Sequence, residues 1–251
     1  MLLKYLRLTL CFFQAFWILW IRAPRLSRQQ KWAEIQSWSL RTLHVMGVTV
    51  RVQADEVSSA TFASPQLLVA NHVSWLDVLV IQSLHPSVFV AKEEVRAWPV
   101  VGAIAQACEV VFVARGSPSS ARKMVAGVSA ALARGHRVAG FPEGTSTEGH
   151  AVRMFHANLF EAAIEQAVDV QPLALRYINA TTGKHCQVAA FVGDLGFIES
   201  LHRVMSAPSI TVHLRLGESL PAQGHSRKTL AQLSHRCVST QLEALSAPAT
   251  H

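Results

Sequence analysis

Short apolar segments alternate with helical stretches along most of the chain after residue 47, and this alternation constrains the fold more than any other feature. Strands are expected at 48–52, 67–70, 88–91, 109–113, 137–141, 170–177, 187–192 and 209–216. Helices are expected at 74–84, 100–107, 117–134, 158–166 and 226–245. We expect 187–192 to pair with 170–177 through the turn at 182–184. The pattern predicts an α/β fold, in which helices flank a mixed, largely parallel sheet.

The N-terminal segment is predicted to form a helical hairpin at a membrane. Residues 8–21 are apolar except for Thr9 and Gln14, and as a helix they would reach about 21 Å, short of a roughly 30 Å hydrocarbon core. A second helix is expected at 29–46, separated from the first by Pro24. The alternatives are a secretory signal for the first helix, although 22–25 lacks a small-residue cleavage pattern, and a core-packed second helix. We therefore expect a membrane-associated segment at 1–47, a globular domain at 48–245 and a loose tail at 246–251.

The charge of the chain favours an anionic membrane surface as a partner. The formal net charge is +7, and several basic residues lie beside the apolar N-terminus. No basic-aromatic module of a nucleic-acid-binding type is present, so we expect no nucleic-acid partner. The four cysteines are far apart, without metal or redox spacing, and we predict neither a metal nor a cofactor. Basic flanks predict the cytoplasmic face of a membrane.

The segment 71–77, Asn-His-Val-Ser-Trp-Leu-Asp, lies between an expected strand and an expected helix. Open α/β sheets usually bind their ligands at the carboxyl ends of strands, where this segment falls. From the first turn of the helix, Asp77 can reach back to His72, fix its tautomer and leave the other ring nitrogen as a base. Such a pair would deprotonate a hydroxyl without an enzyme nucleophile. The alternative is a chance spacing, in which Asp77 only stabilises the helix N-terminus.

Three further segments follow expected strands. Arg115 precedes a helix that begins near Ser117, which suggests an anion site, although a solvated loop arginine is the alternative. In the polar loop 141–149, Glu143 could bind a substrate hydroxyl or the helix terminus, and Gly144 would admit a ligand closely, unless the loop is a simple turn. Pro172 cannot donate to a ladder and predicts a sheet edge or a bulge.

Together these segments resemble the lysophospholipid acyltransferase family that contains 1-acyl-sn-glycerol-3-phosphate acyltransferase. The matching motifs are the histidine and aspartate of 71–77, Phe-Val-Ala-Arg at 112–115, Phe-Pro-Glu-Gly-Thr at 141–145 and Val-Gln-Pro-Leu-Ala at 170–174. The resemblance implies that His72, oriented by Asp77, takes a proton from the free hydroxyl of a lysolipid. The hydroxyl then attacks the thioester of acyl-CoA or acyl carrier protein, the co-substrate. Residues that the resemblance assigns to substrate binding are Asn71, Arg115, Glu143, Gly144 and Thr145.

One departure from the family pattern concerns the acceptor. The family usually has arginine after Pro-Glu-Gly-Thr, where this chain has Ser146, so a phosphate site would lack one guanidinium. The favoured acceptor is 1-acyl-sn-glycerol-3-phosphate, which would give phosphatidic acid at a bacterial-type inner membrane. The alternative is lyso-ornithine lipid, which carries no phosphate. Outside this activity, the alternatives are a membrane-anchored lipid-binding module and a serine hydrolase using Ser74 or Ser146, which lacks a glycine-flanked nucleophile elbow.

Overall fold

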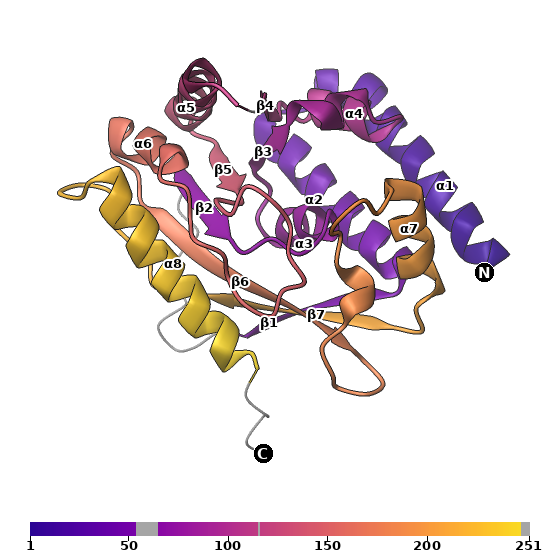
Figure 1. Ribbon diagram of the computed structural model, residues 1–251. Coiled ribbons are helices and arrows are strands. Elements are labelled where there is room, and N and C mark those ends of the chain that lie inside the picture. The colour runs from indigo at the N-terminus through magenta and orange to yellow at the C-terminus, as the bar shows by residue number, and fades with distance from the viewer. Residues whose placement is uncertain (54–64, 115, 247–251) are drawn as a thin grey trace.

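A seven-stranded sheet forms the centre of the protein in a computed structural model that describes residues 1–53, 65–114 and 116–246 (Figure 1). The strand order is β1-β7-β6-β2-β5-β3-β4, and every neighbouring pair is parallel except β6 and β7. The strands are β1 Val48–Gln53, β2 Gln66–Ala70, β3 Val88–Lys92, β4 Val111–Val113, β5 Arg137–Gly140, β6 Val170–Asn179 and β7 Ile210–Leu216. The predicted mixed, largely parallel α/β sheet is confirmed.

Helices cover both faces of this sheet (Figure 1). They are α1 Leu2–Phe16, α2 Arg28–Met46, α3 Leu76–Leu84, α4 Val101–Ala107, α5 Pro118–Ala133, α6 Asn158–Glu165, α7 Phe197–Ser206 and α8 Arg227–Ala244. Along β2, Leu68 and Ala70 belong to the apolar cluster under α2, α3 and α7, while Leu67 and Val69 belong to the cluster under α5, α6 and α8. Because successive strand residues point to opposite faces, the continuous apolar run of β2 is buried on both sides.

The predicted strand at 187–192 is wrong. Residues Gln187–Ala189 form a short 3-10 turn, and β6 takes β7 as its antiparallel partner along Leu173–Asn179. After the turn at 182–184 the chain makes one bridge, from Ile178 to His185, and then leaves the sheet. A turn between two apolar runs suggests a hairpin locally, but the longer β7 occupies the pairing edge of β6. The helix α7, which follows this segment, was not predicted.

Pro172 lies inside the sheet, because β6 has β2 on one side and β7 on the other. The predicted edge position is wrong, but the alternative of a bulge agrees with the pairing. Val170 bridges Leu220 and Leu173 pairs with Leu216, so the partner chain has one extra residue opposite this stretch. The proline ring is accommodated where the antiparallel ladder is interrupted.

The two N-terminal helices form a hairpin, as predicted. Ser27 begins α2 with a capping box to Gln30, and Gly47 ends it with a φ of 79°. Leu43 and Met46 of α2 are buried in the main apolar cluster, so this helix packs on the globular core, as the alternative proposed. By length and composition alone, the helical stretch Leu2–Arg25 is able to cross a membrane. Exposed apolar side chains on this stretch are Leu2, Leu3, Leu6, Leu10, Phe13, Trp17, Trp20 and Ile21.

Candidate active site

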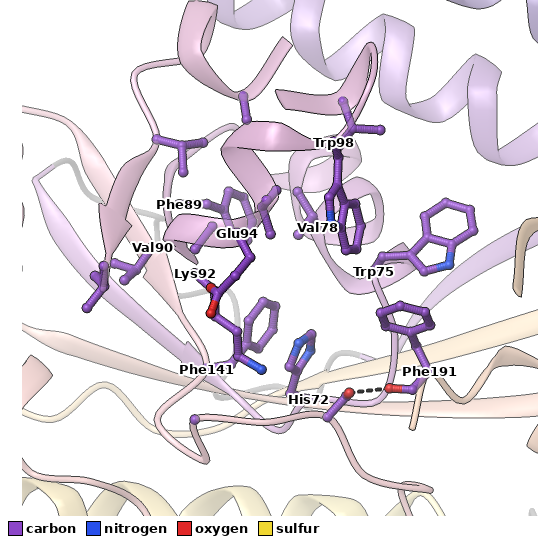
Figure 2. A pocket seen from close by; sticks show the side chains of 18 of the residues that line it. His72, Trp75, Val78, Phe89, Val90, Lys92, Glu94, Trp98, Phe141 and Phe191 are labelled. Atoms are coloured by element: carbon purple, nitrogen blue, oxygen red, sulfur yellow. Dashed lines mark hydrogen bonds between the residues drawn. The ribbon is translucent and has the colours of Figure 1, made fainter. Parts of the chain in front are cut away.

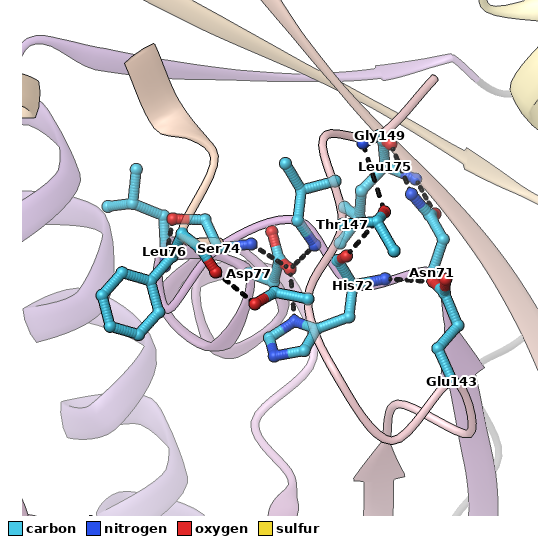
Figure 3. Close-up of polar contacts among 12 residues, drawn as sticks. Asn71, His72, Ser74, Leu76, Asp77, Glu143, Thr147, Gly149 and Leu175 are labelled. Carbon is cyan, nitrogen blue, oxygen red and sulfur yellow. Dashed lines mark hydrogen bonds and ion pairs between the residues drawn. The ribbon is translucent and has the colours of Figure 1, made fainter. Parts of the chain in front are cut away.

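His72 and Asp77 meet at the carboxyl end of β2. The chain leaves the strand after Ala70, and α3 begins at Leu76 after five intervening residues, which places Asp77 in its first turn. His72 Nδ1 lies 2.8 Å from Asp77 Oδ2, and the same oxygen accepts the backbone N–H of Val73 at 2.8 Å and of Ser74 at 2.9 Å (Figure 3). Because a carboxylate only accepts, Nδ1 carries the proton and Nε2 is left as the basic nitrogen. The predicted contact between the two side chains is present.

The second oxygen of Asp77 is held by a residue that the sequence did not indicate. The Tyr177 hydroxyl, on β6, donates to Asp77 Oδ1 at 2.6 Å, and both side chains are fully buried. Burial, together with the Asp77 charge, raises the pKa of Tyr177 well above its ordinary value. The phenol therefore stays protonated and acts as a donor. Tyr177 follows the apolar residues 173–175 after Arg176, and in the sequence it is indistinguishable from any other buried strand residue.

Asn71 anchors this loop to the same strand. Its amide nitrogen donates to the Leu175 carbonyl at 3.0 Å, and its amide oxygen accepts from Leu175 N–H at 2.8 Å (Figure 3). The last backbone pair between β2 and β6 is Ala70 with Leu173, so the Asn71 side chain extends the ladder after the backbone has turned away. Asn71 is completely buried. In this structure it positions the His72 loop, and its predicted contact with substrate stays a prediction.

The loop 141–149 clamps the backbone of His72. Glu143 is buried, and its two oxygens accept the N–H groups of His72 at 2.7 Å and of Arg153 at 2.9 Å. Thr147 N–H donates to the His72 carbonyl at 2.8 Å (Figure 3). Burial raises the pKa of Glu143, while the two backbone hydrogen bonds oppose that shift. Glu143 thus braces the backbone behind His72 rather than the terminus of α3, and its predicted contact with a substrate hydroxyl stays a prediction.

A cavity of about 660 Å³ opens in front of the histidine. The imidazole points into it and stacks on Phe141, with ring centroids 4.1 Å apart and an interplanar angle of 10° (Figure 2). Aromatic and aliphatic side chains from α1, α2, α3, α4 and α7 line part of the cavity, and Trp75, Trp98 and Phe191, from segments that precede or connect these helices, line it as well. A long apolar chain therefore fits beside the basic nitrogen.

Polar groups are few in this cavity. Gly144, with a φ of 71°, is among the lining residues, together with Lys92, Glu94 and His156, and its predicted contact with substrate stays a prediction. Thr145 is half-buried and is not among the lining residues. The predicted anion-binding residue Arg115 lies outside the described residues.

Two observations bear on other chemistries. Ser146 Oγ donates to the Phe191 carbonyl, and Ser74 Oγ is buried and accepts from Leu76 N–H, so neither serine is hydrogen-bonded to His72. This arrangement does not support a serine hydrolase. Within 1–53, 65–114 and 116–246, no group of three or more histidine, cysteine and acidic residues is placed to hold a metal ion.

Comparison with known proteins identifies the family. The family model described as Acyltransferase matches residues 49–176, which is the part of the chain that carries β1 to β6 and the His72 loop. The chain belongs to the acyltransferase family. It is therefore an enzyme of the acyl-transfer class, and the cavity beside His72 is the candidate active site of an acyltransferase.

Individual relatives and one solved structure agree with this assignment. The acyltransferase is 35% identical over 225 residues to a lyso-ornithine lipid O-acyltransferase from Pseudomonas aeruginosa, covering 90% of this chain and 82% of that protein. It is 36% identical over 148 residues to a 1-acyl-sn-glycerol-3-phosphate acyltransferase from Neisseria meningitidis, covering 59% of this chain and 57% of the relative. The crystal structure of the 1-acyl-sn-glycerophosphate acyltransferase PlsC from Thermotoga maritima superposes with a TM-score of 0.68 at 23% identity, covering 98% of both chains. This last similarity shows a shared fold.

Proposed function

We propose that the protein is a lysolipid O-acyltransferase in which His72 is the general base and Asp77 orients it. The observation that supports this best is the hydrogen-bonded pair at the wall of a largely apolar cavity. A hydroxyl inside that cavity meets one basic nitrogen and an environment suited to acyl chains. Among the residues that the structure describes, no serine is hydrogen-bonded to His72. Direct transfer of the acyl group to the acceptor hydroxyl is therefore favoured over an acyl-enzyme intermediate.

The reaction proceeds as follows. Nε2 of His72 takes the proton of the acceptor hydroxyl as its oxygen attacks the thioester carbonyl carbon. The new C–O bond forms, the C–S bond then breaks, and the leaving thiolate receives the proton from the imidazolium. Asp77 stabilises the transient positive charge on the ring, and the donor is acyl-CoA or acyl carrier protein. A positioned base contributes roughly 10²–10⁴-fold to such a rate, and holding both lipids in place supplies much of the remainder.

Two acceptors are candidates. Ser146 presents a hydroxyl that already donates to the Phe191 carbonyl, in place of a cation that would bind phosphate. This favours an acceptor without phosphate, as named for the Pseudomonas relative, whose similarity extends over 90% of this chain. The second candidate is 1-acyl-sn-glycerol-3-phosphate, as named for the Neisseria relative, and Lys92 and His156 in the cavity are the basic side chains that support it.

The site of action is proposed to be a membrane surface, on the cytoplasmic side where a soluble thioester is available. Exposed leucine, phenylalanine and tryptophan side chains recur every three or four residues along α1 and the turn that follows it, so they form one stripe on the helix. Arg7 is exposed beside this stripe, and its charged end can reach the lipid headgroups. Flotation of the protein with anionic vesicles tests this membrane binding. Replacing both Phe13 and Trp17 by glutamate is expected to abolish the flotation.

An acyl-transfer assay tests the function. Purified protein would be given lyso-ornithine lipid or 1-acyl-sn-glycerol-3-phosphate, each with an acyl-CoA and with an acyl carrier protein donor. We expect turnover of the ornithine acceptor, a loss of about 10²–10⁴-fold in His72→Ala, and full activity in the exposed control His44→Ala. Turnover of the phosphate acceptor alone would reverse the choice between acceptors. Retention of more than about a tenth of the rate by His72→Ala would contradict the role of the base.

A further inference from the structure

The two oxygens of Asp77 have different partners, and the difference points to a third member of the site. Oδ2 accepts from His72 and from the backbone N–H groups of Val73 and Ser74. Oδ1 accepts from the hydroxyl of Tyr177, which is 100 positions away in the sequence and reaches it from β6. Neither Asp77 nor Tyr177 has solvent-accessible surface. Water therefore has no route to replace this hydroxyl on Oδ1.

The hydrogen bond from Tyr177 is of the strong kind. An O–H donor at 2.6 Å from an ionised carboxylate lies in the range of charge-assisted hydrogen bonds. In a buried site such a bond withdraws negative charge from the carboxylate more effectively than the same bond in water. The charge that His72 experiences from Asp77 is thus set partly by β6, on the opposite side of the aspartate.

We propose that Tyr177 is a positioning residue of the acyl-transfer reaction, which holds Asp77 in place and moderates its attraction for a proton on His72. The proposal rests on the proposed role of His72 as the base. An imidazole beside a more basic carboxylate keeps its proton to higher pH, and a protonated ring cannot take the proton of a hydroxyl. By sharing the charge of Asp77, Tyr177 weakens the hold of the carboxylate on a second ring proton, so that Nε2 stays available as the base.

Other ionisable groups face this site and must be accounted for. Glu143 on the loop 141–149 lies behind His72, and Cys186 donates its backbone N–H to the Tyr177 carbonyl at 2.9 Å. Lys92, Glu94 and His156 line the cavity in front of the ring. None of these side chains is hydrogen-bonded to the Tyr177 hydroxyl. A difference between the wild type and a variant that lacks only this hydroxyl therefore reports on Asp77.

The experiment compares Tyr177→Phe with Tyr5→Phe. These are the two tyrosines of the chain, and the Tyr5 hydroxyl is hydrogen-bonded to a different histidine, His202, at 2.7 Å. The phenylalanine ring keeps the core filled at position 177. Protonation of His72 is followed by NMR on histidine-labelled protein, with the signal assigned by its loss in His72→Ala, and the pH profile of kcat/KM is recorded in parallel. Both measurements use the full-length chain.

In Tyr177→Phe we expect the titration midpoint of His72 and the acid limb of the profile to move up by roughly half a pH unit to one unit. We also expect kcat to fall several-fold with little change in KM, because Tyr177 does not line the cavity. Combined with Asp77→Asn, the tyrosine change should add no further loss, since it acts through the aspartate. Tyr5→Phe should leave the midpoint unchanged. An unmoved midpoint in Tyr177→Phe, or additive losses in the double variant, would overturn the proposal.

A second measurement avoids any loss of folding. Incorporation of 3-fluorotyrosine in a Tyr5→Phe background replaces the phenol at position 177 with a phenol of greater acidity and keeps the hydrogen bond to Asp77. A stronger donor should lower the basicity of Asp77 further, so the His72 midpoint moves down. No shift, or an upward one, would refute the proposal. If these midpoints move as expected while no acceptor is turned over, the proposed function fails and the link between Tyr177 and His72 stands.

Discussion

Replacing Asn71 with alanine tests whether this side chain holds the active-site loop. The substitution removes an amide whose nitrogen and oxygen are hydrogen-bonded to the carbonyl and N–H of Leu175. Asn71 is completely buried, so after the change both Leu175 groups have no side-chain partner in the space they face. An unsatisfied buried polar group costs about 1–3 kcal/mol, and two of them predict a loss of about 2–6 kcal/mol in the free energy of unfolding.

Urea and thermal unfolding in detergent provide the measurement. For a chain of this size, 1 kcal/mol corresponds to roughly 2–4 °C, so a loss near 3 kcal/mol lowers Tm by roughly 6–12 °C. The matched control is Asn179→Ala on the same strand. The Asn179 side chain also accepts two backbone N–H groups, of Thr181 and Thr182, but at an exposed turn where water replaces it. The control should lose about 1 kcal/mol or less.

Activity should fall together with stability in Asn71→Ala, mainly through kcat, because the loop that carries His72 is no longer attached to β6. A side chain that binds the acceptor directly would behave differently. If Asn71→Ala unfolds within about 2 °C of the wild type and its KM for the acceptor rises, then the ladder extension is unimportant and Asn71 contacts substrate.

Three further changes have defined outcomes. Glu143→Gln deprives either His72 N–H or Arg153 N–H of its acceptor, since an amide nitrogen cannot accept, and urea unfolding should show a loss of about 1–3 kcal/mol. Burial and the charge of Arg137 lower the pKa of His85 from 6.5 to about 4. The unfolded chain therefore takes up this proton before the folded chain does, and the free energy of unfolding decreases as the pH falls from about 6.5 towards 4. In His85→Gln this decrease should be smaller, as urea unfolding at several pH values would show. Trp38 lines both the main cavity and a neighbouring cavity of about 130 Å³. Trp38→Ala should join the two cavities and shift kcat/KM towards donors with longer acyl chains. An unchanged dependence of kcat/KM on chain length would contradict this.

The sequence by itself determined the features that depend on near neighbours. The continuous apolar run of β2 indicated a strand buried on both faces, and its partners β5 and β6 were placed in the same way. Ser27 and Gly47 act within one helical turn of the ends of α2, where a capping serine and a glycine are local signals. The contact between His72 and Asp77 also belongs here, because a five-residue separation across the start of a helix puts the two side chains within reach of each other.

The tertiary structure alone decided which distant strand supports those groups. Tyr177 and Leu175 look like ordinary apolar-strand residues in the sequence, yet they hold Asp77 and Asn71. The same limit explains the strand wrongly expected at 187–192, because a turn signal does not show which of two apolar segments will occupy the edge of β6. Local periodicity reports which face of a segment is buried. The partner against which it is buried is chosen by packing and hydrogen bonding over the whole domain, and in this protein that choice completes the candidate active site.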